Sequence, residues 1–423
     1  MLKANSITRK SWIKYDTNSD FPIQNIPFGV FKSSQKNTNT HIGTIIGNTL
    51  ISLTEMEKLN YFKNTNLKDQ TFQGTNLNPF IKQGQTIWRE VRDNIALIFD
   101  LENPILKNNL KHRNIILFSK TDTRMIMPIS IGDYTDFYSS KDHAMNVGKM
   151  FRDPNNALLP NWLHIPVGYH GRSSSIVVSN TDIKRPSGQI LDKISQKPVF
   201  SKTKLLDFEL EMGFVTGEGK KLGEPITTDE AEQYIFGLCL FNDWSARDIQ
   251  KWEYVPLGPF LGKNFASSIS PWIITLDALE PFKIRGEKQS PKVLPYLKYK
   301  GEKHYDINLE VIIHPENCEK TIVSQSNFKY MYWNMVQQLA HHTINGCNIK
   351  AGDLMASGTI SGPQSSEYGS MLELSWGGTK NVNLSNKQTR KFIQDHDTVI
   401  MRGYAQKNNI RIGFGEVRNK IIK

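Results

Sequence analysis

Short apolar runs separated by polar residues, glycines and prolines dominate the chain from about residue 114 onward. They occur at residues 115–118, 175–178, 307–313 and 397–401. Runs of this length with such boundaries are typical of strands in a β-sandwich or barrel. Residues 327–342, where apolar positions recur near helical spacing, are expected to form a helix. The pattern therefore predicts a mainly β (α+β) body.

The first part of the chain differs in composition and in its pattern of apolar residues. It is polar, rich in Asn and Thr, and contains short β-like runs at residues 29–31 and 42–46. Helices are expected at residues 53–62 and 85–102. Few groups suited to catalysis cluster there. We therefore expect an accessory domain over residues 1–118 and a catalytic domain over residues 119–423.

Composition and charge narrow the class of protein. The chain has 423 residues, of which 38% are hydrophobic and 22% charged, enough apolar material for a sizeable core. The formal net charge is +11, but the basic residues are scattered and form no nucleic-acid motif. We interpret this charge as a diffuse solvated surface, so no nucleic-acid partner is expected.

Cysteine usage and hydropathy indicate in which cellular compartment the protein is expected. Cys239, Cys318 and Cys347 are odd in number and form no CxxC pair, which argues against a disulfide framework or a zinc ribbon. The polar, basic residues 1–15 lack the apolar core of a signal peptide. A membrane span needs about 18 apolar residues in a row, and we expect none. These features favour a cytoplasmic protein.

Strict alternation marks residues 207–214. On a strand, Phe208, Leu210 and Met212 would face one side, while Glu209 and Glu211 would face the other. Two interpretations remain open here. The acids form the solvated face of a half-buried strand, or they are hard oxygen ligands for Mg²⁺, Ca²⁺ or Mn²⁺.

Residues 131–143 gather three acids, two tyrosines and a histidine. The imidazole of His143 is a candidate general base, because histidine is suited to this role at neutral pH. Asp136 is a candidate for a third metal ligand. The alternative for His143 is an ordinary structural histidine.

Two further segments carry candidate polar groups. An apolar run ends at Asp243, followed by Arg247 and Gln250; a weak surface Asp–Arg pair is the alternative there. Residues 258–267 superficially resemble a phosphate-binding loop, but only three residues separate the glycines. We reject a nucleotide site and expect Lys263 to reach an oxyanion.

Glu373 lies between apolar residues on an expected strand. An unpaired carboxylate would be costly in such surroundings. It therefore needs a partner, for which His143 is a candidate.

Taken together, these segments resemble the fumarylacetoacetate hydrolase family. Four stretches carry the resemblance, which runs from about Asp133 to Trp376 and more loosely over the whole chain: residues 133–140, 161–172, 258–263 and 358–363. The first three are highly specific in combination, whereas the last is shared more widely with related enzymes.

The resemblance implies a role for each matching residue. The implied metal ligands, for Ca²⁺ or Mg²⁺ with Mn²⁺ possible, are Asp136, Glu209, Glu211 and Asp243, with Lys263 and Ser267 at a second Mg²⁺ position beside Asp243. The implied catalytic groups are His143, Glu373, Arg247, Gln250 and Lys263. The implied substrate contacts are Tyr138, Arg152, Tyr169, Gln250, Tyr254 and Thr359.

Two departures from the family pattern stand out. Ser267 replaces a threonine and keeps the hydroxyl. Lys141-Asp142 replaces the usual Arg-Gln before the histidine and adds a negative charge next to His143.

The family also implies an architecture and a reaction. The fold would be a small SH3-like N-terminal barrel followed by a mixed β-sandwich roll, assembled as a homodimer. The implied reaction cleaves a carbon–carbon bond of 4-fumarylacetoacetate, a dicarboxylate diketo compound, in the last step of tyrosine and phenylalanine degradation. Acylpyruvate hydrolase, oxaloacetate decarboxylase and hydratase activities are the nearest alternatives, because those relatives share the acidic triad. A basic binding module without catalysis is a remote one.

Overall fold

A five-stranded sheet organises the N-terminal part of the chain. The computed structural model describes residues 2–33 and 39–423, so Met1 of the segment expected to lack a signal peptide lies outside them. The sheet order is β4-β3-β2-β1-β5. The bounds are β1 Gly29–Ser33, β2 Thr40–Ile46, β3 Thr49–Ser52, β4 Leu117–Ser119 and β5 Thr123–Ile126.

The elements expected in this part are mostly confirmed. Strands β1 and β2 cover the two predicted runs, and helices α1 (Leu53–Lys58) and α3 (Gln85–Ile98) begin where expected but end earlier. The strand predicted at residues 115–118 is partly wrong. Helix α5 (Leu110–Ile116) covers the first half of that run, and Asn109 caps it by accepting a hydrogen bond from the His112 amide.

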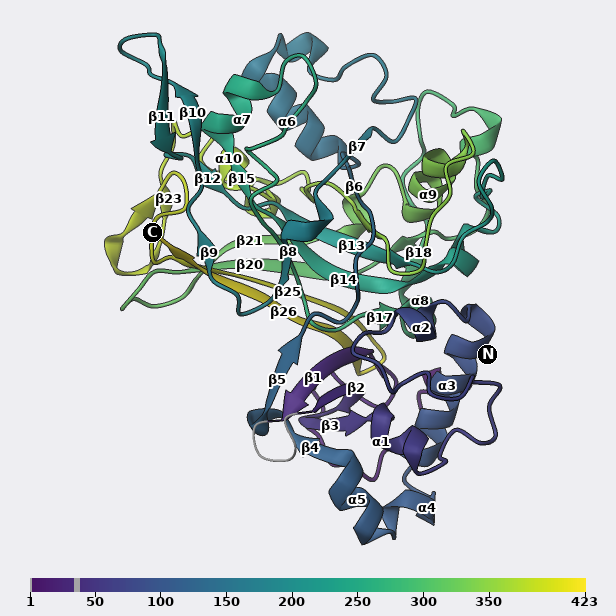
Figure 1. Ribbon diagram of the computed structural model, residues 1–423. Helices are drawn as coiled ribbons and strands as arrows, with labels where there is room; N and C mark the ends of the chain where they lie inside the picture. Colours follow the sequence, from purple (N-terminus) through teal and green to yellow (C-terminus); the bar gives the residue numbers. More distant parts are fainter. Residues whose placement is uncertain (1, 34–38) are drawn as a thin grey trace.

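Two larger sheets build the rest of the molecule (Figure 1). The eight-stranded sheet has the order β7-β6-β22-β13-β14-β16-β8, with β17 paired to β14; the five-stranded sheet has the order β21-β20-β25-β26-β9. The bounds in the first are β6 Tyr134–Phe137, β7 Gly168–His170, β8 Ile176–Val178, β13 Leu210–Thr216, β14 Ile235–Asp243, β16 Ser267–Ile269, β17 Ile274–Thr275 and β22 Leu354–Ala356. Those in the second are β9 Ile183–Lys184, β20 Asn308–His314, β21 Thr321–Asn327, β25 Thr398–Lys407 and β26 Ile410–Ile422.

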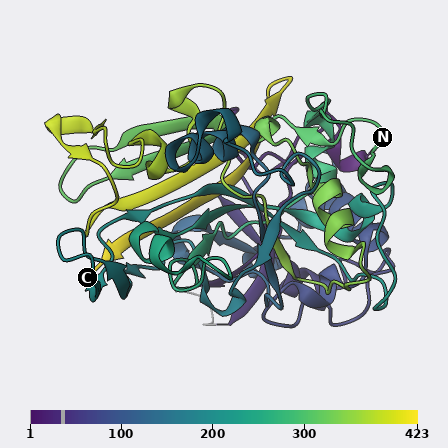
Figure 2. The same cartoon turned by 90° about the horizontal axis from the view of Figure 1, so that it is seen from above.

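The two large sheets share one hydrophobic core. Met212 and Leu240 of the eight-stranded sheet belong to the same buried cluster as Met401 of β25. Figure 2 shows the long strands β25 and β26 running beside the eight-stranded sheet. The predicted strand-rich sandwich roll preceded by a smaller domain is therefore confirmed.

The central strands β13 and β14 are buried along their whole length. The solvated acidic face considered for residues 207–214 is therefore wrong, because Glu209 and Glu211 are both buried. On the same side of β13 as Glu211, Val215 packs into the core of the N-terminal domain. Burial on both faces leaves the acids in need of polar partners.

Three helices lie on the side of the eight-stranded sheet away from the N-terminal domain (Figure 1). They are α6 (Lys141–Phe151), α7 (Arg247–Glu253) and the short α10 (Met371–Leu374). The helix expected at residues 327–342 is shorter, since α9 spans Met335–Thr343 and begins at a capping box formed by Asn334 and Gln337. No helix among the described residues is long and apolar enough to cross a membrane.

Candidate active site

Four carboxylates converge where strands of the eight-stranded sheet end. Asp136 lies on β6, Glu211 on β13 and Asp243 at the end of β14, while Glu209 immediately precedes β13. One ligand atom from each of the four lies within 4.8 Å of the others, and all four residues are buried. Strand β22 lies between β6 and β13, and its small Ala356 pairs with Asp136. The curled sheet thus brings distant acids together.

A lysine and neighbouring hydroxyl groups contact this acidic cluster. Lys263 Nζ lies 2.7 Å from Glu209 Oε2 and 2.6 Å from Asp243 Oδ2. Ser267 Oγ donates to Asp243 Oδ1 at 3.0 Å, so the serine keeps the hydroxyl at this position. Tyr169 donates to Asp243 Oδ2 at 3.3 Å. All of these contacts place groups predicted from the sequence at one centre.

Burial and mutual repulsion govern the protonation of the acids. Burial, reinforced by the negative charge of Asp243, raises the pKa of Asp136 well above its ordinary value. Burial and the charges of Asp136 and Asp243 do the same to the pKa of Glu211. For Glu209, burial opposes ionisation, but attraction to Lys263 and Arg247 overcomes it and lowers the pKa. Ionisation of all four acids would give the cluster more negative charge than Lys263 and Arg247 neutralise, so Asp136 and Glu211 resist ionisation without a further cation.

Two oxygen atoms of the cluster have no hydrogen-bond partner among the described residues. Asp136 Oδ1 and Glu211 Oε1 are buried and accept no hydrogen bond from the described part of the chain. Buried carboxylate oxygens are normally paired with donors or with a metal ion. An all-oxygen ligand set suits a hard divalent cation such as Mg²⁺ or Ca²⁺. The residues present therefore fit the expected metal.

Beside the carboxylates lies a buried histidine–glutamate pair. His143 Nδ1 lies 2.7 Å from Glu373 Oε2, and both side chains are shielded from solvent. Burial favours a neutral Glu373, but attraction to His143 and hydrogen bonds from His143 and Asn146 overcome it and lower its pKa. His143 also helps to lower the pKa of Glu209, so the pair and the acidic cluster interact electrostatically. An ionised Glu373 can orient His143 and stabilise its protonated form.

The surroundings of Glu373 correct the sequence-based expectation. Glu373 lies in helix α10 rather than on a strand, and Ser370 caps this helix by accepting a hydrogen bond from the Glu373 amide. Asn146 donates to Glu373 Oε1 at 2.9 Å, and Ser361 and Ser370 donate to Oε2 at 2.9 Å each. Sequence reasoning missed these orienting groups. One signal was available, since Asn146 lies three residues after His143 on the same helix face.

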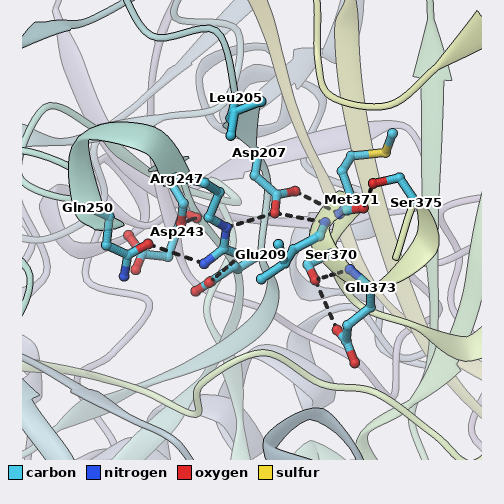
Figure 3. A network of polar contacts seen from close by, with 12 residues as sticks. Leu205, Asp207, Glu209, Asp243, Arg247, Gln250, Ser370, Met371, Glu373 and Ser375 are labelled. Atoms are coloured by element: carbon cyan, nitrogen blue, oxygen red, sulfur yellow. Dashed lines mark hydrogen bonds and ion pairs between the residues drawn. The ribbon is translucent and has the colours of Figure 1, made fainter. Parts of the chain in front are cut away.

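Arg247 is held by buried acids, as Figure 3 shows. Its Nε donates to Asp207 at 2.8 Å, and its Nη2 lies 2.7 Å from Glu209. The surface Asp243–Arg247 pair considered from the sequence does not form. Asp207 was also missed: it accepts hydrogen bonds from the Met371 and Leu372 amides at 2.6 and 3.0 Å. It therefore ties Arg247 to the helix that carries Glu373.

The expected substrate contacts differ in how closely the structure links them to this centre. Gln250 Oε1 accepts a hydrogen bond from Arg247 at 3.3 Å. Burial, followed by the charge of Glu373, raises the pKa of Tyr138, and Arg152 is among the opposing charges. Thr359 is buried, and its hydroxyl finds no partner among the residues that the structure describes. Tyr254 is 53% exposed at the end of α7.

Lys141 and Asp142, the departures before His143, have different surroundings. The Lys141 ammonium lies over the ring of Tyr332, 5.6 Å from its centroid. Burial and the charge of Glu287 raise the pKa of Asp142.

Fold and site together define a class of protein: a strand-rich hydrolase in which a buried oxygen-ligand cluster lies beside a histidine–glutamate pair. The model of the fumarylacetoacetate (FAA) hydrolase C-terminal domain matches residues 133–422, and that of the fumarylacetoacetase N-terminal domain matches residues 24–128. The chain therefore belongs to the fumarylacetoacetate hydrolase family.

Individual relatives agree over nearly the full length. The chain is 50% identical to the fumarylacetoacetase of Homo sapiens over 413 residues, covering 97% of this chain and 98% of the relative. It is 51% identical to the fumarylacetoacetase of Dictyostelium discoideum over 418 residues, covering 98% of each. Among solved structures, a fumarylacetoacetate hydrolase from Exiguobacterium antarcticum aligns with a TM-score of 0.53 at 17% identity, covering 94% of this chain and 99% of that one. This structure supports the fold alone. The chain is an enzyme of the fumarylacetoacetase type.

Proposed function

We propose that this enzyme hydrolyses 4-fumarylacetoacetate to fumarate and acetoacetate. The observation that carries the proposal is the 2.7 Å His143–Glu373 pair beside four buried carboxylates, in a chain about half identical to fumarylacetoacetases. The reaction breaks the bond between a carbonyl carbon and the carbon next to it. The products then follow from addition of one water molecule.

His143 provides the base for this reaction. Its Nδ1 is engaged by Glu373, which leaves Nε2 to accept a proton from water. The water oxygen attacks the carbonyl carbon on the fumaryl side and gives a tetrahedral oxyanion. When that intermediate collapses, the carbon–carbon bond breaks and its electron pair leaves as the acetoacetate enolate. The proton held by His143 then returns to the enolate carbon.

Positive and polar groups stabilise the charge that develops. Lys263, Arg247 and Gln250 lie on one side of the site and can donate to the oxyanion. Loss of one such donor typically lowers the rate roughly 100- to 1000-fold. Arg152 and the phenols of Tyr138, Tyr169 and Tyr254 suit the two substrate carboxylates, and Thr359 adds a buried hydroxyl.

The four carboxylates would hold the cation that the family uses. Asp136, Glu209, Glu211 and Asp243 would bind Ca²⁺ or Mg²⁺, with Mn²⁺ as a further candidate, and Lys263 and Ser267 would support Asp243. The bound ion would supply Lewis-acid stabilisation of the charge on the diketo oxygens.

One assay tests the reaction. The diketo absorbance of fumarylacetoacetate is followed with purified enzyme, with enzyme treated with a chelator, and after Mg²⁺ or Ca²⁺ is restored. We expect turnover to be lost with the chelator and recovered with the ion. An acylpyruvate and oxaloacetate are tested in parallel. Faster turnover of either compound would reassign the substrate to one of the related activities.

Assembly and location are part of the proposal. We expect a homodimer, as in the family, and exposed apolar side chains such as Ile194 and Phe200 are suited to an interface. Light scattering coupled to gel filtration measures the mass directly, and a monomer at all concentrations would contradict the dimer. The described structure contains free cysteines only, consistent with a reducing, cytoplasmic location. Cell fractionation tests that location.

A further inference from the structure

Glu253, the last residue of α7, holds three consecutive backbone amides of the following loop. Its Oε1 accepts hydrogen bonds from the amides of Phe260 at 2.8 Å and Gly262 at 2.7 Å, and its Oε2 accepts one from Leu261 at 3.0 Å. A carboxylate at the C-terminal end of a helix is disfavoured by the helix dipole. Here the three amide donors stabilise the carboxylate, so the position of Glu253 depends on its contact with the loop.

The loop held by Glu253 connects the donor groups of the active site. Helix α7 begins with Arg247 and contains Gln250, and Lys263 immediately follows the loop. Lys263 in turn contacts Glu209 and Asp243. Any movement of the loop end relative to α7 would therefore separate Lys263 from Arg247 and Gln250.

The end of the loop is hydrogen-bonded to the start of α7 and also packs closely against this helix. Gly262 accepts a hydrogen bond from the Ala246 amide at 2.8 Å through its carbonyl group. A Cβ atom on Gly262 would lie 2.7 Å from Gln250 Cβ, so the backbone of the loop packs directly on the helix. Gly262 thus forms hydrogen bonds with Glu253, the last residue of α7, and with Ala246, which precedes its first residue.

Burial does little to hold the rest of the loop. Val255 is 68% exposed, Leu257 97% and Phe260 67%. An exposed segment with few apolar contacts opens easily unless hydrogen bonds fix it. The triple contact with the Glu253 carboxylate is suited to supply that restraint.

From this geometry we propose that Glu253 is a positioning residue for the hydrolysis. It fixes loop 254–262 on α7 and so keeps Lys263 in register with Arg247 and Gln250. The inference rests on the proposed function, because it assigns Glu253 to the same oxyanion-stabilising group. Glu253 itself need not touch the substrate.

The test compares Glu253→Gln and Glu253→Ala with the wild-type full chain. Glutamine keeps one acceptor oxygen, whereas alanine keeps none. We expect kcat on fumarylacetoacetate to fall about 10-fold in the glutamine variant and about 100-fold in the alanine variant, as misplaced donors would cause. KM should change less than kcat, since the substrate contacts Arg152, Tyr138 and Thr359 lie on other elements and only Tyr254 lies in the loop. The graded loss separates positioning from simple loss of folded enzyme.

Hydrogen exchange on the same proteins provides a readout without substrate. Exchange of the amides of residues 260–262 should accelerate in both variants, while β13 and β14 keep their protection. Glu319→Gln is the matched control, because Glu319 is an exposed glutamate in the turn between β20 and β21. It should leave exchange and kcat unchanged.

Two results would overturn the inference while leaving the proposed reaction intact: unchanged exchange at residues 260–262 in Glu253→Ala, or faster exchange with kcat equal to that of active wild type. A wild-type enzyme without turnover would instead contradict the proposed function, and the positioning role with it.

Discussion

His143 shows how one contact can decide the chemistry of a site. Its 2.7 Å contact with Glu373 orients the ring. The candidate metal ligands are four carboxylates, and His143 is not among them. We therefore expect His143→Ala to lower kcat by at least about 1000-fold, as loss of a positioned base does, without releasing metal. The measurement pairs a turnover assay with elemental analysis. Retained hydrolysis would remove the base assignment, and loss of metal would place His143 among the ligands.

Replacement of Glu209 by glutamine tests whether its negative charge, rather than its size, is needed to bind metal. Glu209→Gln keeps the volume but removes the negative charge that Lys263 and Arg247 share. We expect metal affinity to fall at least about 10-fold, because a neutral amide is a weaker ligand and the two cations then repel the ion. Titration with Mg²⁺ or Ca²⁺ by calorimetry measures this directly. Glu310→Gln on β20 is a matched control, and unchanged affinity in Glu209→Gln would argue against the carboxylate cluster.

Single residues also show which site features a sequence can reveal. The alternation of Glu209 and Glu211 is local, so their common side of a strand was predictable. Their burial was not, because it depends on packing against segments far along the chain. The hydrogen bonds from Ser361 to Glu373, and from the residues 260–262 to Glu253, likewise depend on loop geometry that no periodicity encodes.

At the scale of elements, the start of one helix, α9, was predicted eight residues too early. The apolar residues between 327 and 334 imitate a helical pattern, but Phe328 and Trp333 are buried in different clusters. The capping box at Asn334 marks the true start of α9. The spacing of Ser370 and Glu373 is likewise typical of a helix start, whereas the apolar neighbours of Glu373 suggested a strand.

Burial of His304 makes the stability of the folded chain depend on pH. It lies on β19 (His304–Tyr305), where burial lowers its pKa to about 4 and a hydrogen bond with the Met331 carbonyl only partly opposes the effect. The folded state thus favours neutral His304, whereas the unfolded chain binds a proton near pH 6.5. Its contribution to stability is complete above pH 6.5 and is lost as the pH falls toward 4.

The expected size of this effect can be measured. Between pH 7.5 and pH 5, binding of a proton to His304 in the unfolded chain should lower the unfolding free energy by about 2 kcal/mol. Urea unfolding of His304→Gln should show a pH-dependent loss smaller than wild type by that amount, whatever the other histidines contribute. Exposed His164 provides the control substitution. Equal pH dependence in His304→Gln and wild type would show that His304 does not carry this linkage.

At the scale of the whole molecule, the two parts of the chain share a core. The ring of Phe236 on β14 contacts Phe28 at a tilted angle and Phe80 and Trp88 edge-on, with ring centroids 5.7, 5.7 and 5.0 Å away. Arg89 adds a bidentate contact to Asp277 at 2.9 Å for each bond. The composition predicted two parts, but their common core arises from contacts between residues about 150 to 200 positions apart, which local patterns do not encode. The N-terminal part thus supports the strand that presents Asp243.

This shared core predicts cooperative unfolding of the full chain. Phe236→Ala should cost about 3–5 kcal/mol and uncouple the parts, because it removes the ring that the N-terminal aromatic residues contact. We expect one calorimetric transition in wild type and two in the variant, with exchange in α3 rising before exchange in β20. Phe214→Ala, in the core between the large sheets, should lower stability similarly but keep one transition. A single transition in Phe236→Ala would mean that the remaining contacts, including Arg89–Asp277, suffice to couple both parts.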